Sequence, residues 1–97
     1  MGTYIALSNF TDQGIRSIKD TTKRSDAVKD AAKKFGASMT QIYWTLGHYD
    51  LVAIIEAPDV ESATAFALSI GASGNVRTQT LRAFSKDDMN GILGKLA

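Results

Sequence analysis

The chain has 97 residues, of which 11 are Lys or Arg and 10 are Asp or Glu, so its formal net charge is only +1. This length suits one domain over residues 1–97, and the near-neutral charge gives no broad positive field for a nucleic acid or an anionic membrane. The absence of cysteine excludes disulfides and thiolate chemistry. With no signal-like start and no long apolar run, we expect a cytoplasmic protein without a membrane partner.

The first part of the chain shows a strand pattern followed by helical patterns. Residues 3–9 predict a strand, and the turn that follows is expected to be capped by Thr11. A longer helix comes next, with Ser25 and Asp26 as expected caps and Gly36 as the expected stop.

Residues 38–46 predict a second strand with two unlike faces. Ile42, Trp44 and Leu46 share one face, and Tyr43 lies on the other. The two aromatic side chains therefore cannot form one stacking platform. One of them packs inward and the other lines a pocket or an interface, and the spacing leaves open which is which.

The second half of the chain again gives a strand, a helix and a strand. Residues 51–55 are continuously aliphatic, as expected for a central strand covered on both sides. Asp59 is expected to cap a helix that ends at Gly71, and residues 75–84 predict a fourth, more polar strand. A capping-box pattern at 85–88 begins a final helix.

This order of elements is the split βαβ pattern of an α+β, ferredoxin-like βαββαβ fold with an additional C-terminal helix. It predicts a four-stranded antiparallel sheet in which the first and third strands are central. Two helices cover one face, yet residues 51–55 are apolar toward both faces. We therefore expect the open face to pair sheet to sheet with a second copy, in a homodimer or a higher closed oligomer.

Four segments of the chain carry a family resemblance: NFTDQGIRSIKD (9–20), GHYDLV (47–52), EAPD (56–59) and GNVRTQTLRAF (74–84). Together they resemble the GYD-domain family, which is grouped with the dimeric α+β barrels. The resemblance implies ferredoxin-like protomers that pair through their sheets. It implies no particular activity, and since relatives commonly carry an acidic residue where this chain has His48, it implies no histidine mechanism.

The tetrad 47–50, Gly-His-Tyr-Asp, contains the only histidine of the chain and joins two predicted strands. Glycine and aspartate are ordinary hairpin residues, so a structural turn is the favoured interpretation. The catalytic alternative would use His48, Tyr49 and Asp50 for proton transfer, with the carboxylate orienting the imidazole. No local motif marks a Ser or Cys nucleophile to accompany them.

Six polar residues at strand ends or on strand faces are candidates for a ligand site. They are Asn9, Tyr43, His48, Tyr49, Asp50 and Arg82. One acid, one base and several hydrogen-bonding groups suit a small aromatic or carbonyl-bearing organic molecule. A nucleotide would need a glycine-rich helix N-terminus. Arg77 and Arg82 are five residues apart and are expected on opposite faces of their strand.

Several ligand classes are not expected. A single histidine and scattered carboxylates make no metal set, so we expect no metal and no cofactor. The third strand, 51–57, has no aromatics, which separates this chain from RNA-binding domains of the same topology. The favoured function is a small-molecule-binding or regulatory homo-oligomer. The alternatives are a cofactor-free monooxygenase- or isomerase-like enzyme and a purely structural assembly module.

Overall fold

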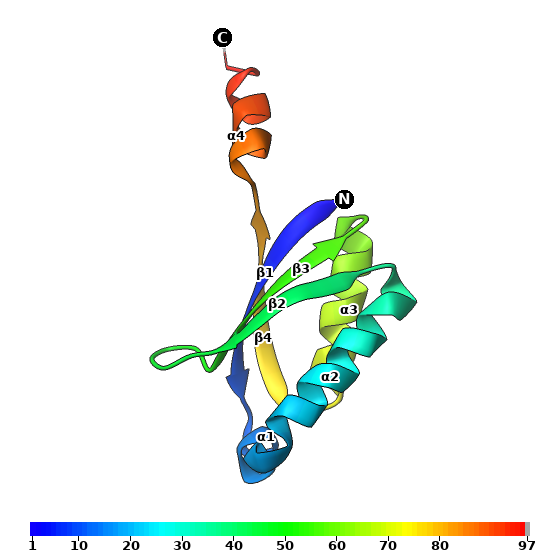
Figure 1. Cartoon of the computed structure of the whole chain (residues 1–97), viewed down its shortest axis with the longest axis vertical. Helices are drawn as coiled ribbons and strands as arrows, with labels where there is room; N and C mark the ends of the chain where they lie inside the picture. Colours follow the sequence, from blue (N-terminus) through cyan, green and yellow to red (C-terminus); the bar gives the residue numbers. More distant parts are fainter. Residues whose placement is uncertain (97) are drawn as a thin grey trace.

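The computed structural model describes residues 1–96 as a twisted sheet with two long helices on one side and a C-terminal helix that stands apart (Figure 1). The elements are β1 (Gly2–Phe10), α1 (Asp12–Arg16), η1 (Ile18–Asp20), α2 (Thr21–Ala32), η2 (Lys33–Phe35), β2 (Ser38–Trp44), β3 (Leu51–Ala57), α3 (Val60–Ala72), β4 (Val76–Ala83) and α4 (Lys86–Leu93). The order confirms the predicted ferredoxin-like α+β fold. None of the helices in residues 1–96 has the length and apolar character needed to span a membrane.

The four strands lie in the order β2-β3-β1-β4, and every neighbouring pair is antiparallel. The predicted central position of the first and third strands is therefore confirmed. Ala6 lies opposite Ala53 on one side and Thr80 on the other. Because side chains alternate along a strand, this register assigns the even-numbered residues of β1 to the helix face and the odd-numbered ones to the open face.

The core lies between the sheet and the two long helices, α2 and α3 (Figure 1). Phe66 of α3 is almost completely buried, and its ring centroid is 5.8 Å from that of Phe35. Tyr4, Met39 and Ile55 meet this cluster from the sheet. Burial of such large apolar side chains is the main stabilising contribution in a domain of this size.

The opposite face of the sheet carries an apolar stripe that no helix covers. Ile54 lies beside Ile5, which in turn lies beside Leu81, so three strands contribute to it. Tyr43 lies on this open face, opposite Val52. Trp44, the next residue of β2, lies on the helix side. Both aromatic side chains remain exposed, Tyr43 by 55% and Trp44 by 43%, so the expectation that one of them packs inward is wrong.

Three sequence-based expectations on element ends are wrong: the start of α2, the end of β2 and the glycine at the end of α3. α2 begins at Thr21, before the expected caps Ser25 and Asp26, because the preceding 3-10 turn η1 leads directly into it. The Ser25 hydroxyl instead donates to the Thr22 carbonyl at 2.7 Å, inside the helix. β2 stops at Trp44, which leaves the expected strand residue Leu46 fully exposed.

The glycine that ends α3 is also different from the expected one. The helix continues through Gly71 to Ala72, and the left-handed residue is Gly74, with φ of 86°. Gly36, with φ of 68°, confirms the predicted end of the preceding helical segment. A positive φ is readily adopted only by glycine, so the glycine that the chain requires here is the one with the positive φ, Gly74, and not the one inside the helix, Gly71.

The predicted helix caps at Asp59 and Ser85 are confirmed. Asp59 Oδ1 accepts from the Ser62 backbone at 2.7 Å, and Ser85 forms a reciprocal capping box with Asp88, both bonds being 3.0 Å. These backbone hydrogen bonds lower the pKa of both carboxyl groups. Beyond this cap, α4 stands apart from the sheet and from α2 and α3, with Met89 and Leu93 exposed (Figure 1).

The fold predicts opposite effects for two glycine-to-alanine substitutions. A Cβ on Gly14 would lie 2.1 Å from the Asn75 carbonyl oxygen, whereas one on Gly71 would meet nothing within 4 Å. We expect Gly14→Ala to lower the free energy of unfolding by about 2 kcal/mol or more through overpacking. Gly71→Ala should raise it by up to about 1 kcal/mol, since alanine favours a helix interior. Urea unfolding measures both, and equal effects would contradict the close packing of α1 on residue 75.

Candidate functional site

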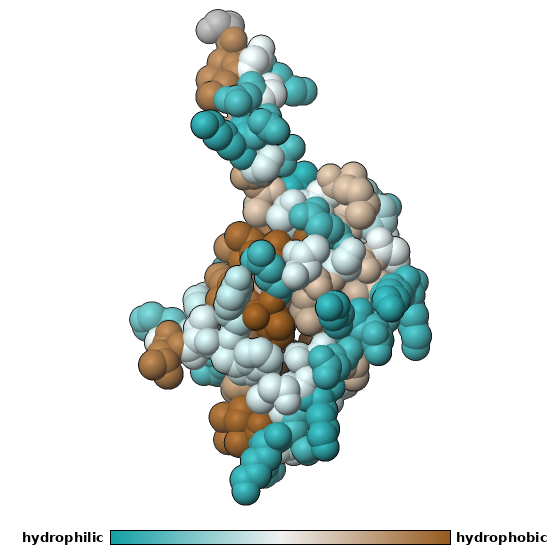
Figure 2. All heavy atoms as spheres, in the orientation of Figure 1, coloured by the Kyte–Doolittle hydropathy of each residue, from teal (hydrophilic) through white to brown (hydrophobic). Residues whose placement is uncertain are grey.

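A cavity of about 90 Å³ lies between the sheet and helices α2 and α3. Its walls are mostly apolar, with Ala6 and Ala53 on the sheet side and Val28 and Ile70 on the helix side. Figure 2 shows apolar atoms exposed between the strands and the helices. Four alanines, Ala6, Ala53, Ala63 and Ala67, are among the lining residues, and their small side chains contribute to the unfilled space.

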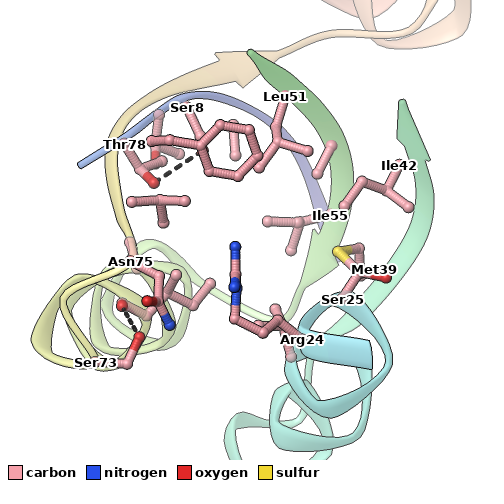
Figure 3. A pocket seen from close by; sticks show the side chains of 18 of the residues that line it. Ser8, Arg24, Ser25, Met39, Ile42, Leu51, Ile55, Ser73, Asn75 and Thr78 are labelled. Atoms are coloured by element: carbon pink, nitrogen blue, oxygen red, sulfur yellow. Dashed lines mark hydrogen bonds between the residues drawn. The ribbon is translucent and has the colours of Figure 1, made fainter. Parts of the chain in front are cut away.

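One part of the cavity wall is polar (Figure 3). Ser8 of β1 and Thr78 of β4 face it from the sheet, and their hydroxyl oxygens are 3.0 Å apart. Asn75 lies just before β4, and Arg24 of α2 enters from the helix side. Figure 3 shows the Arg24 guanidinium pointing toward the middle of the cavity.

Arg24 is held in place by the segment that precedes its helix. Its Nη1 donates to the Ser17 carbonyl at 2.6 Å, and its Nη2 donates to the Gly14 carbonyl at 3.1 Å. Both acceptors are uncharged. Within residues 1–96 the only ion pair is the exposed Lys33–Asp30 contact at 3.9 Å, so no carboxylate of this part of the chain neutralises the guanidinium.

The hairpin of residues 45–50 is organised by hydrogen bonds that a structural turn requires. Thr45 donates its backbone N–H to the Asp50 carbonyl at 2.8 Å and its hydroxyl to the Tyr49 carbonyl at 2.6 Å. The Asp50 carboxylate accepts from the Phe10 backbone N–H at 2.9 Å. Asp50 therefore bonds to the end of β1, rather than to an imidazole.

The six sequence-predicted ligand residues do not form one cluster. Tyr49 reaches the open face of the sheet, where its hydroxyl donates to Gln79 Oε1 at 2.8 Å, and Tyr43 and Asn9 lie on this same face. His48 is exposed in the hairpin.

Arg82 lies far from the hairpin, at the other end of β4. It is opposite Tyr4 on the helix-side register, so the expectation that Arg77 and Arg82 face opposite sides is confirmed. Its guanidinium carbon is 5.4 Å from the centroid of the Tyr4 ring and 4.7 Å from that of the Phe84 ring. These distances fit cation–π contacts. Arg82 lines a separate groove between α3 and β4.

Ser8, Arg24 and Thr78 were not predicted from the sequence as site residues. The sequence pattern did contain a signal for two of them, Ser8 and Arg24. Ser8 continues the inward-facing series of its strand, and Arg24 precedes Val28 by four residues, which places it on the apolar side of α2. A polar residue on an inward-facing position is informative because it needs a partner there.

The side chains of the cavity can bind and orient a molecule by hydrogen bonds and charge. Arg24 supplies a positive charge, and the Ser8–Thr78 pair supplies hydroxyl groups. In the part of the chain that the structure describes, no three acidic or histidine residues come close enough to hold a metal ion.

Comparison with known proteins identifies the family. The GYD domain matches residues 4–93. A Thermus thermophilus protein named glutamine synthetase and cystathionine beta-lyase binding protein is 31% identical over 90 residues, which cover 92% of this chain and 95% of that one. The crystal structure of TTHA0845, also from Thermus thermophilus, is 28% identical, with a TM-score of 0.57, and the match covers 88% of this chain and 95% of that one.

The fold defines a small ferredoxin-like α+β protein, as its structural similarity to TTHA0845 also indicates. The chain belongs to the GYD-domain family. The resemblance seen in the four sequence segments is thereby confirmed.

The hairpin geometry predicts different effects for substitutions of Asp50 and of His48. We expect Asp50→Ala to lower the free energy of unfolding by ~1 kcal/mol or more, because the half-buried Phe10 N–H loses its acceptor. His48→Ala should leave stability within about 0.5 kcal/mol, as is usual for exposed positions. Thermal unfolding of both variants measures this, and an equally large loss for His48→Ala would refute the assignment of His48 as a replaceable turn residue.

Proposed function

We propose that this protein is a non-catalytic, cytoplasmic binding protein that takes a small organic molecule into the cavity between its sheet and its helices α2 and α3. The observation that carries the proposal is the cavity itself, about 90 Å³ in volume and lined mostly by apolar side chains, with polar groups on part of its wall. Small-molecule sites have this composition, since the apolar walls exclude water and the polar groups orient the ligand.

The proposal also includes assembly of the chain into a homodimer or a closed oligomer through the open sheet face. The central stripe of Ile5, Ile54 and Leu81 supports it, because a contiguous apolar surface gains stability when a second copy covers it. In such an assembly, Tyr43 and Tyr49 would lie at the interface rather than at a ligand site.

A second candidate function is the binding of other proteins, which would make the assembly regulatory. The Thermus relative is named as a binding protein for glutamine synthetase and cystathionine beta-lyase. In the present chain, the exposed Met89 and Leu93 of α4 offer an apolar contact away from the sheet. The two functions are compatible, because the cavity and α4 are different parts of the molecule.

The enzymatic alternative receives less support from the geometry. A monooxygenase- or isomerase-like mechanism would need its proton-transfer groups beside the bound molecule. His48, Tyr49 and Asp50 lie on the hairpin instead and do not line the cavity. We therefore assign Asp50 a structural role and give His48 and Tyr49 no part in catalysis.

A thermal-shift screen of small organic compounds tests the binding function. We expect saturable stabilisation by small aromatic or carbonyl-bearing compounds and none by nucleotides. Ala67→Leu, which enlarges a side chain at the cavity wall, should remove this stabilisation. Ala65→Leu on the same helix is the matched control, since Ala65 is exposed. Preferential stabilisation by nucleotides would contradict the choice of ligand, and no stabilisation by any compound would leave an assembly role as the better account.

Light scattering with a charge-introducing variant tests the assembly. We expect the wild-type protein to show at least twice the 10.4 kDa mass of one chain at micromolar concentration. Ile54→Lys should shift it to the monomer mass, because an uncompensated charge would be buried in the interface. Ala65→Lys on the exposed side of α3 should leave the mass unchanged. A monomeric wild-type protein would contradict pairing through the sheet.

A further inference from the structure

We propose that the molecule taken into this cavity is a small monocarboxylate with an apolar body, and that Arg24 binds its carboxylate group. This inference rests on the proposed binding function and adds the chemical class of the ligand and the residue that recognises it. Three features carry it: an arginine without a counter-charge, a hydroxyl pair on the opposite wall, and a mostly apolar lining.

Arg24 provides a positive charge that the protein itself leaves uncompensated. It is the only charged residue among the side chains that line the cavity. A guanidinium has five N–H donors, and the two carbonyl acceptors at residues 14 and 17 use only part of them. A half-buried charge is costly without a partner, so an anion entering the cavity would gain a charge-assisted hydrogen bond there.

The two carbonyl bonds also give Arg24 a defined position. They hold the guanidinium against the turn between α1 and α2, so that binding a ligand requires little additional ordering of this long side chain. In Figure 3 the guanidinium points between the helices toward the sheet. A carboxylate placed there would be met by a donor that is already oriented.

The sheet contributes hydroxyl donors on the other side of the cavity. Ser8 is buried, and its hydroxyl oxygen is 3.0 Å from that of Thr78. Each hydroxyl has one proton, and their mutual hydrogen bond uses one of the two. The other proton has no acceptor among the side-chain hydrogen bonds of residues 1–96, so it is available to a ligand oxygen.

Most of the remaining wall is apolar, which favours a ligand with an apolar body; the other polar residues on it are Thr21, Ser25, Ser73, Asn75 and Thr80. Ala6, Ala53, Val28 and Ile70 offer only apolar contact, which stabilises a hydrocarbon ring or chain and gives nothing to a hydrated phosphate. No acidic side chain lines the cavity, so an amine would find no counter-charge. The volume of about 90 Å³ suits a small organic molecule, and no glycine-rich helix N-terminus on the wall offers a site for the phosphates of a nucleotide.

Titration of the ¹⁵N-labelled full chain, followed by NMR, tests this inference with benzoate, benzamide and inorganic phosphate. Benzamide has the shape of benzoate without its charge. We expect saturable shifts of cavity residues with benzoate, with benzamide binding about tenfold more weakly because it lacks the charge-assisted bond to Arg24. Phosphate should not shift these residues saturably.

Variants locate the interaction on Arg24. Arg24→Gln should weaken benzoate binding about tenfold and leave benzamide binding unchanged, so that the preference for the acid disappears. Lys23→Gln removes the same charge from the neighbouring, exposed position of α2 and should preserve that preference. If Arg24→Gln fails to fold, the comparison of benzoate with benzamide on the wild-type protein still decides the charge requirement.

The possible outcomes separate this inference from the proposed function. Equal affinities for benzoate and benzamide would overturn the carboxylate assignment while leaving a neutral-ligand site in the cavity. Unchanged benzoate binding in Arg24→Gln would overturn the role of Arg24. Saturable phosphate binding at the same residues would overturn the carboxylate assignment in favour of a general anion site. No shift of cavity residues with any of the organic probes, together with no stabilisation in the broad screen, would overturn the proposed function itself.

Discussion

The antiparallel pairing of β1 with β3 is the constraint on which the rest of the structure depends. Ala6 opposite Ala53 sets the register, and a slip of one residue would turn every side chain of β1 to the other face. In the observed register, Tyr4 and Ser8 face α2 and α3, while Ile5 and Leu7 face the open side. The central strands are therefore apolar on both faces, and only one of these faces is covered by the chain's own helices.

The same register explains why there is a cavity. The centre of the sheet presents two alanines, and α3 faces them with Ala63 and Ala67, which also line the cavity. Methyl groups on both sides do not fill the space between the sheet and the helices, whereas away from the cavity a large side chain, Phe66, fills it. A core made of small residues lowers the gain from burial in a short chain, so a ligand or a second copy would add to its stability.

Polar contacts tie together the segments around the polar part of the cavity. Asp50 bonds to the Phe10 backbone, the Thr11 backbone donates to the Asn75 carbonyl at 3.1 Å, and Arg24 bonds to the carbonyl of Gly14. Three connections that are far apart in the sequence thus meet beside the end of β1. Asp50, which the sequence offered as a site residue, supports the end of β1 here. The hairpin residues 47–50 do not line the cavity.

The sequence predicted the fold better than it predicted the candidate site, because the site is made of residues that lie far apart in the chain. Ser8, Arg24 and Thr78 are separated by 16 and 54 positions in the sequence, and no local pattern relates them. They line the same cavity because β4 pairs with β1 and α2 packs across the same face of the sheet. Local patterns reflect interactions between near neighbours along the chain, whereas a binding cavity is formed by side chains that only the folded topology brings together.

The sequence by itself determined the type and order of the elements, because apolar periodicity and capping are local properties. It also determined the caps at Asp59 and Ser85 and the two-sided apolar character of β3. Only the tertiary structure decided where α2 begins, because the turn η1 leads directly into it. It also decided on which face of the sheet Tyr43 and Trp44 lie, because this follows from the strand register and from the hydrogen bond between Trp44 and Thr21 at 3.0 Å.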